Sequence, residues 1–159
     1  MKTSLSTGFS FGLTSGIITT LGLMVGLHSG THSQAAVAGG ILTIALADSF
    51  SDALGIHVSQ ESQKEVSKKQ VWAATFSALV SKLLIGLSFM VPIFFLDLLP
   101  AVVISVIWGL LVLTIFSYLL GRKRNSNGWQ MALEHLSIAL VVIMATHFLG
   151  DWVAQLFGN

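Results

Sequence analysis

The sequence predicts an all-α membrane protein with five transmembrane helices, and three observations support this fold class. The chain of 159 residues is 53% hydrophobic and only 9% charged, whereas a soluble domain has about 25% charged residues. Five apolar segments are each long enough to cross about 30 Å of hydrocarbon, which takes roughly 20 helical residues. All but one of the basic residues lie outside these segments, before the first one and in alternate connections.

The five spans follow one another through short polar connections and are expected to form one transmembrane domain over residues 1–159. Their predicted bounds are 8–27, 35–57, 72–96, 99–120 and 130–156. Residues 1–27 have the pattern of a signal peptide, but the four further spans favour a retained helix. Pro92 is expected to kink the third span, and Pro100 suits the first turn of the fourth, where its missing N–H costs nothing.

Glycines recur every four residues along the first span. Such spacing lets helix backbones approach closely. We favour packing within the fold over a dedicated dimer face as its cause. The two glycine runs are Gly8, Gly12 and Gly16, then Gly22, Gly26 and Gly30.

The distribution of Lys and Arg predicts the orientation of the chain. Seven of the eight basic residues fall on one side of the predicted topology, which places the N-terminus in the cytoplasm and the C-terminus outside. The exception is Lys82, inside the third span. A multi-pass protein without an organelle presequence is most simply placed in a prokaryotic inner membrane. The seven residues are Lys2, Lys64, Lys68, Lys69, Arg122, Lys123 and Arg124.

Two carboxylates interrupt the second span in the stretch ALADSFSDALGIH. Asp48 and Asp52 lie about 40° apart on one helix face. An ionised Asp at the centre of a membrane helix costs about 2.5–3.5 kcal/mol, so the pair must face protein or water. Neighbouring carboxylates also repel, so one is protonated unless a cation shares the site. The pair therefore predicts cation binding or proton carriage.

Other polar residues extend this prediction towards both faces of the membrane. Asp52 lies roughly 7 Å from the cytoplasmic end of its span, and Glu134, near the start of the fifth span, lies at a similar depth. We therefore expect Glu134 to join the acid pair. Towards the outer face, His147 and Asp151 are four residues apart, and His28, His32 and Asp97 occupy the predicted outer connections. Such a cluster suits the release of a cation or the passage of a proton.

A structural interpretation competes with this one. Lys82 lies roughly 15 Å into the third span, close to the depth of Asp48. An ion pair between them would neutralise both charges without a transported ion, because charged groups within a membrane usually pair. The hydroxyl groups of the first span offer a further set of partners for a buried Asp. They belong to Thr14, Ser15, Thr19 and Thr20.

Two stretches, GLTSGIITTLGLMVGL and AGGILTIALADSFSDALGIHVSQES, resemble the first two helices of the vacuolar iron transporter family. The family patterns are like L-x-D-G-I-x-T-x-x-G-x-x-x-G and L-A-D-x-x-S-M-A-L-G-E-Y-x-S-x-x-S. The likeness is specific over residues 8–62. The matching positions are Leu13, Gly16, Thr19, Gly22, Gly26, Leu46, Ala47, Asp48, Ser51, Ala53, Leu54, Gly55, Ser59 and Ser62.

The resemblance implies a homodimer that exports Fe²⁺, and often Mn²⁺, from the cytoplasm in exchange for protons. Ser15 stands where the family has its first-helix Asp, and Asp52 stands where it has its second-helix Met. Replacing sulfur by carboxylate favours harder ions. Only SQESQKEVSKKQ joins the second and third spans, as in the short bacterial and archaeal members that lack a cytoplasmic metal-binding helical domain.

These observations predict a proton-coupled exporter of Fe²⁺ or Mn²⁺. Asp48, Asp52, Glu134 and Ser15 would bind the cation, and His147 with Asp151 would lie on the release or proton path. The cation is the substrate, and no resident cofactor is expected. No nucleophile–base motif predicts an enzyme, and a net charge of +1 indicates no nucleic-acid partner. The alternatives are a non-transporting membrane scaffold and a transporter of the same fold for another solute.

Overall fold

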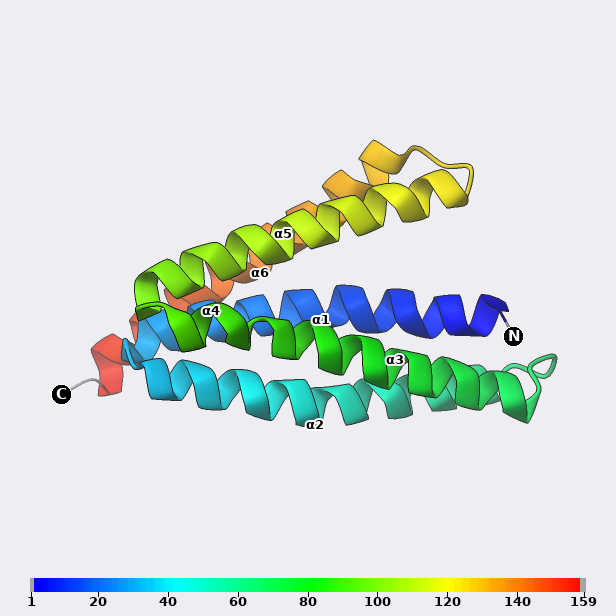
Figure 1. Ribbon diagram of the computed structural model, residues 1–159, viewed down its shortest axis with the longest axis horizontal. Coiled ribbons are helices and arrows are strands. Elements are labelled where there is room, and N and C mark those ends of the chain that lie inside the picture. The colour runs from blue at the N-terminus through cyan, green and yellow to red at the C-terminus, as the bar shows by residue number, and fades with distance from the viewer. Residues whose placement is uncertain (1, 158–159) are drawn as a thin grey trace. The chain divides into compact units, whose positions relative to one another are not determined.

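The computed structural model of the protein describes residues 2–157, and the side chains from residue 3 onward. Within this range all regular structure is helical (Figure 1). Met1, Gly158 and Asn159, at the ends of the predicted single domain, lie outside the described residues. The helices are α1 Lys2–Thr31, α2 Gln34–Glu61, α3 Lys68–Ser88, α4 Met90–Phe95, α5 Leu98–Lys123 and α6 Gly128–Phe157.

The five predicted spans are found as helices, which confirms the all-helical fold class. Five helical segments of the described chain are long and apolar enough to cross a membrane, and the third joins α3 with α4. The segments extend one to five residues past their predicted bounds, because a helix continues into polar sequence after its apolar run ends, except that the third ends at Phe95, one residue before its predicted end. The segments are Thr3–Thr31, Gln34–Glu61, Lys68–Phe95, Leu98–Lys123 and Gly128–Phe157.

Both prolines act as predicted. Pro92 has no N–H, and its ring would clash with the carbonyl of Ser88 four residues earlier. Accordingly α3 ends at Ser88, and Phe89 N–H donates instead to Gly86 O at 3.2 Å before α4 begins. Pro100 lies in the first turn of α5, directly after the N-terminal cap residue Asp97 and two leucines. The kink in the third span is therefore a one-residue interruption of the helix.

The described chain forms two compact units, and both draw on α1 and α2. The first unit combines the chain up to Thr20 with Ile41–Met90, and the second combines Leu21–Gly40 with the chain from Val91 onward. The first unit thus contains the N-terminal part of α1, the C-terminal part of α2, and α3. The second contains the rest of α1 and α2, with α5, α6 and most of α4.

In the first unit, α1 packs against α3 through its first glycine run. A Cβ atom on Gly8 would collide with Ala74 O, and one on Gly12 would collide with Ala78 O and Ser81 Oγ. The two helices therefore approach backbone to backbone at these positions, and Figure 1 shows α1 and α3 running side by side. Packing within the fold, the favoured explanation of this spacing, is confirmed for the first run.

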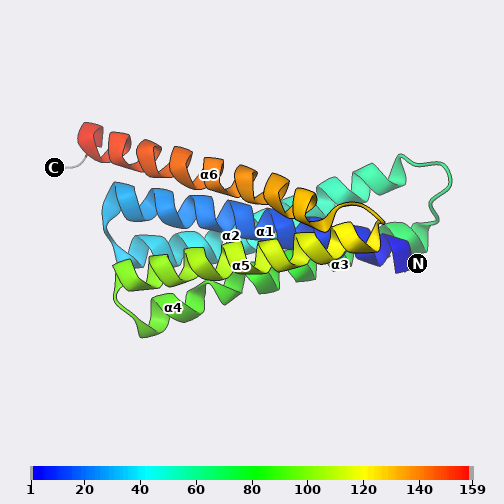
Figure 2. The same ribbon diagram turned by 90° about the horizontal axis from the view of Figure 1, so that it is seen from above.

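In the second unit, α1 packs against α6 through its second glycine run. A Cβ atom on Gly22 would lie 2.8 Å from Val142 Cγ1, and one on Gly30 would lie 3.3 Å from Gly150 O. Helix α6 also packs along α5, and Figure 2 shows the tight turn that joins them. Asn125 takes the left-handed conformation in this turn, with φ of 55°.

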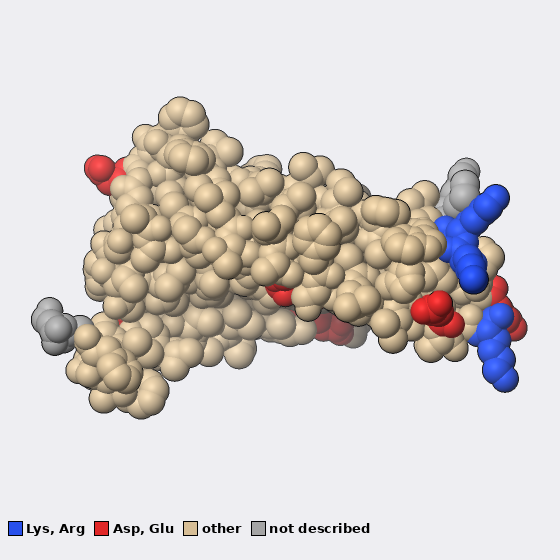
Figure 3. All heavy atoms as spheres, turned by 90° about the horizontal axis from the view of Figure 1, so that it is seen from below, with Lys and Arg blue, Asp and Glu red and all other residues tan. Residues whose placement is uncertain are grey.

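The surface has the polarity expected for contact with lipid. Large apolar side chains such as Phe94, Phe95 and Trp129 are exposed, whereas Lys82 and Thr20 are buried. Most of the surface displayed in Figure 3 accordingly belongs to neither acidic nor basic residues. This polarity supports a multi-pass membrane protein, because lipid tails solvate apolar side chains and leave polar groups to find partners inside.

Adding a methyl group at the α1–α3 contact is expected to destabilise the fold. Gly12→Ala should lower the thermal midpoint in detergent and cost about 1–3 kcal/mol, because overpacking a tight contact displaces backbone. The matched control is Gly55→Ala in α2, where an added Cβ meets nothing within 4 Å. Equal midpoints for the two variants would contradict the close α1–α3 contact.

Candidate functional site

Three helices of the first unit bring four polar side chains together. Asp48 and Asp52 lie one turn apart on α2, Ser15 comes from α1, and Lys82 comes from α3. Helical spacing alone gives the two carboxylates a common direction. Their neighbours Ala45, Ser49 and Ala53 are buried, whereas the carboxylates are partly exposed. We call Ser15, Asp48, Asp52 and Lys82 the acid–lysine cluster.

Lys82 is the centre of the acid–lysine cluster. Its side chain is 2% exposed, and its Nζ lies 2.5 Å from Asp48 Oδ2. The same ammonium forms an ion pair and a hydrogen bond with Asp52 Oδ2. It also donates to Ser15 Oγ at 3.0 Å. The proposed ion pair between Lys82 and Asp48 is therefore confirmed, and Asp52 shares the same ammonium.

Ser15 links the first helix to the acid pair. Its hydroxyl donates a hydrogen bond of 2.6 Å to Asp52 Oδ2 while its oxygen accepts from Lys82. The predicted hydroxyl partner is thus present, together with the ammonium rather than in place of it. A carboxylate at this position of α1 would add a third negative charge beside Asp52, so a serine suits the arrangement found.

Small residues allow the three helices to approach closely enough to enclose Lys82. A Cβ atom on Gly16 would lie 2.6 Å from Ile85 Cγ2 and 3.2 Å from Lys82 Cγ. On the other side, a Cβ atom on Gly86 would lie 3.2 Å from Ala45 Cβ. The aliphatic stem of Lys82 consequently packs in the α1–α3 contact, and its charged end emerges beside α2.

The charges of the acid–lysine cluster do not balance. Two ionised carboxylates and one ammonium sum to −1, with the carboxylates 28% and 21% exposed. Asp48 Oδ2 accepts no hydrogen bond within the described chain, although it lies beside the ammonium. Buried charge that is not compensated is costly. The single ammonium of Lys82 therefore compensates the charge of only one of the two carboxylates.

Glu134, predicted to join the acid pair, belongs to the second unit. It is exposed on α6, and its Oε1 accepts a hydrogen bond from Gln130 Nε2 at 3.1 Å. Its neighbour His135 forms a 2.7 Å hydrogen bond with Ser117 of α5. Participation of Glu134 in a cation site stays a prediction.

His147 and Asp151 lie together on α6 as their spacing predicts. His147 Nε2 is 3.5 Å from Asp151 Oδ2, and Nδ1 of the same ring is hydrogen-bonded to Ser29 Oγ of α1. Ser29 is buried, and the sequence analysis did not single it out. Its place in the second glycine run, beside Gly30, was the available signal, because that run marks the face of α1 that meets α6.

No family model matches the chain, and no curated protein matches it. Within residues 2–157, no three His, Asp or Glu side chains are already gathered as a metal-binding group. The acid–lysine cluster provides carboxylate and hydroxyl oxygens, which are ligands for hard cations. The ammonium of Lys82 lies beside these oxygens.

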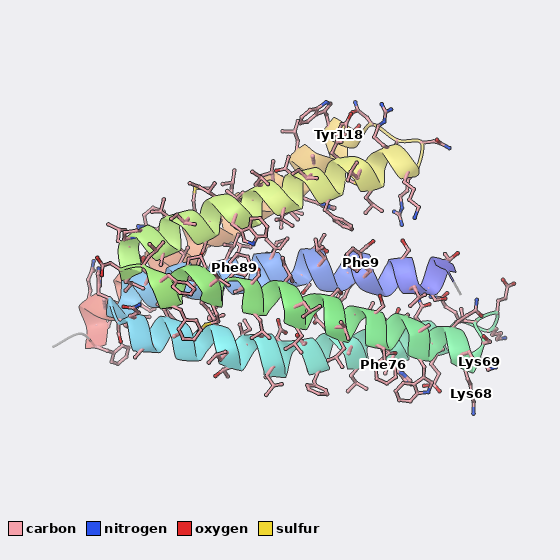
Figure 4. All side chains as sticks on the ribbon, viewed as in Figure 1. Phe9, Lys68, Lys69, Phe76, Phe89 and Tyr118 are labelled. Carbon is pink, nitrogen blue, oxygen red and sulfur yellow. The ribbon has the colours of Figure 1, made fainter. Side chains whose placement is uncertain are left out.

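Removing the ammonium is expected to destabilise the protein. Lys82→Met keeps the length of the stem but leaves Asp48 and Asp52 facing each other, at a cost of about 3 kcal/mol, the low end for a broken buried pair. Thermal unfolding in detergent measures the effect. The control is Lys69→Met at the exposed start of α3 (Figure 4), where a change below about 0.5 kcal/mol is expected.

The triple variant Lys82→Met, Asp48→Asn, Asp52→Asn separates charge from packing. It removes both the cation and the two anions, so it should recover most of the stability that Lys82→Met loses. If the triple variant is no more stable than Lys82→Met alone, repulsion between the carboxylates is not the cause of the loss.

Proposed function

We propose that this protein is a membrane transporter that exports divalent cations, Fe²⁺ or Mn²⁺, in exchange for protons. The acid–lysine cluster is its exchange site. The observation that carries the proposal is the shared ammonium, because two carboxylates around one Lys82 hold a net charge of −1 inside apolar helices. Ionisable groups within membrane helices are rare and are typical of ion and proton pathways.

The exchange follows from the charge balance. A proton on Asp48 or Asp52 brings the cluster to neutrality. A divalent cation bound by both carboxylates brings the sum to +1 while the ammonium remains, so Lys82 must withdraw or lose its proton. Proton, ammonium and metal therefore compete for the same carboxylate oxygens. Since metal ligands must be deprotonated, protonation of the pair weakens cation binding and releases the ion.

The choice of ion rests on the ligands and on the resemblance. Carboxylate and hydroxyl oxygens suit hard ions such as Mn²⁺, whereas Fe²⁺ rests on the resemblance. The likeness of residues 8–62 to the vacuolar iron transporter family supports the same ions and export from the cytoplasm. His147 and Asp151 would then lie on the release or proton path near the outer face. The arrangement of basic residues supports a cytoplasmic N-terminus, and the proposed location is a prokaryotic inner membrane.

The proposed transporter is a homodimer, as the resemblance implies. In the first unit, a line of small residues on α2 is exposed, and an added Cβ on Gly55 meets nothing within 4 Å. Small residues permit close contact between membrane helices, so this line supports close approach of a second copy. Its members are Thr43, Ala47, Ser51 and Gly55.

A membrane scaffold is the second candidate. It is favoured by the contacts of Lys82, because the ammonium and Ser15 already provide partners for both carboxylates. In that case the acid–lysine cluster would only hold α1, α2 and α3 together. A transporter of the same fold for another solute is the third candidate, and it follows from the presence of Lys82 where a metal would bind.

Flux into proteoliposomes tests the proposal. The protein should carry Mn²⁺ or Fe²⁺ into the lumen, which a metal-sensitive dye follows. Protons should leave the lumen in exchange, so its pH should rise as the metal enters. Asp52→Asn should lower the flux at least tenfold, because it removes a carboxylate shared by the proton and the metal. The control is Glu65→Gln, which removes an exposed carboxylate from the α2–α3 connection.

The other outcomes point to other functions. A scaffold gives no flux with any divalent ion, and a transporter of another solute gives proton movement only with that solute. Wild-type Mn²⁺ or Fe²⁺ flux in Asp52→Asn would refute the acid–lysine cluster as the exchange site. Glu134→Gln, measured in parallel, decides whether Glu134 contributes.

A further inference from the structure

A second group of titratable side chains lies in the second unit, where the end of α1 meets α6. His28 is in the last turn of α1, and His32 follows the helix directly. Ser29, between them in sequence, contacts His147 of α6. Three imidazoles and the carboxylate of Asp151 thus come from two neighbouring helices.

The turn after α1 keeps His32 beside His28. His32 has φ of 50°, in the left-handed region, and its N–H donates to His28 O at 3.0 Å. The two ring centroids are consequently 5.5 Å apart. With metal–nitrogen distances of about 2.0–2.1 Å, two imidazoles that share one tetrahedral metal have ring centres roughly 5–6 Å apart. The observed spacing already suits a shared metal.

His28 also has an unused ring nitrogen. Its Nδ1 is inaccessible to solvent and has no hydrogen-bond partner within the described chain. A buried polar atom without a partner costs about 1–3 kcal/mol. A neutral imidazole nitrogen is a ligand for borderline transition metals. His28 Nδ1 is therefore a candidate metal ligand.

His147 is set up as a third ligand. Asp151 lies next to Nε2 of its ring, which leaves Nδ1 as the nitrogen that faces α1. Metal-bound histidines commonly donate their other N–H to a carboxylate, which fixes the ring and raises its basicity. Nδ1 of His147 is hydrogen-bonded to Ser29 Oγ in this structure, so a metal bound to Nδ1 would replace the hydrogen bond to Ser29.

We propose that His28, His32 and His147 bind one divalent transition-metal cation of the Zn²⁺ or Co²⁺ class, with Asp151 orienting His147. No three ligands surround one point among residues 2–157 before binding, so the site closes by side-chain rotation. It uses imidazole nitrogens from the second unit and does not depend on transport through the acid–lysine cluster. Imidazole selects these ions over Mg²⁺ and Ca²⁺, which prefer oxygen.

Co²⁺ absorption spectroscopy on the full-length protein in detergent tests the site. The wild type should bind Co²⁺ with the intense visible bands of tetrahedral nitrogen ligation, which oxygen ligands of the acid–lysine cluster would not give, and Zn²⁺ should abolish these bands. His28→Gln/His32→Gln should weaken this binding at least tenfold, and His147→Gln should weaken it as well. The matched control is His135→Gln, whose imidazole is hydrogen-bonded to Ser117 in the same unit and should leave the bands unchanged.

Two further variants make the result decisive. His32 is exposed, so His32→Gln alone tests the ligand without disturbing the fold. Asp52→Asn should keep the Co²⁺ bands, which separates failure of this site from failure of the proposed transport. Equal Co²⁺ affinity in the wild type and in His28→Gln/His32→Gln would overturn the proposal, and so would an equal loss in His135→Gln.

Discussion

One constraint governs the first unit: charge within apolar helices must be compensated by charge nearby. Asp48 and Asp52 meet this requirement in part through Lys82, one ammonium for two carboxylates, which reaches them from α3 with only 2% of its side chain exposed. The attraction between the ammonium and the carboxylates is stronger here than on a surface, because electrostatic interactions strengthen as water is excluded. The position of α2 relative to α1 and α3 is thereby tied to these four side chains.

Close helix contact makes this compensation possible. Gly8 and Gly12 bring α1 onto the backbone of α3, and Gly16 leaves room for the stem of Lys82. A larger residue at Gly16 would displace Lys82 or Ile85 and move the ammonium away from the carboxylates. Sequence pattern, packing and electrostatics thus act at the same place: small residues set the helix spacing, and the spacing sets the charge distances.

The two groups of polar residues differ in chemistry. The acid–lysine cluster offers carboxylate and hydroxyl oxygens around an ammonium, and the proposed exchange would use these oxygens. The histidines of the second unit have nitrogen ligands and an unused ring nitrogen on His28. Oxygen ligands and nitrogen ligands favour different ions, so the two proposals concern separate properties of the chain.

The sequence by itself determined the five helices, the break near Pro92 and the common face of Asp48 and Asp52, because these depend on composition, local sterics and helical period. It also placed Lys82 near the depth of Asp48, since helical rise converts residue number into depth. It left open whether the acids face a hydrated ion, an ammonium or a hydroxyl, and it did not mark Ser29 as the partner of His147. Those outcomes depend on how each helix is rotated about its axis, and rotation is set by the packing of neighbouring helices. Only the tertiary structure turned Ser15 and Lys82 towards the same carboxylate.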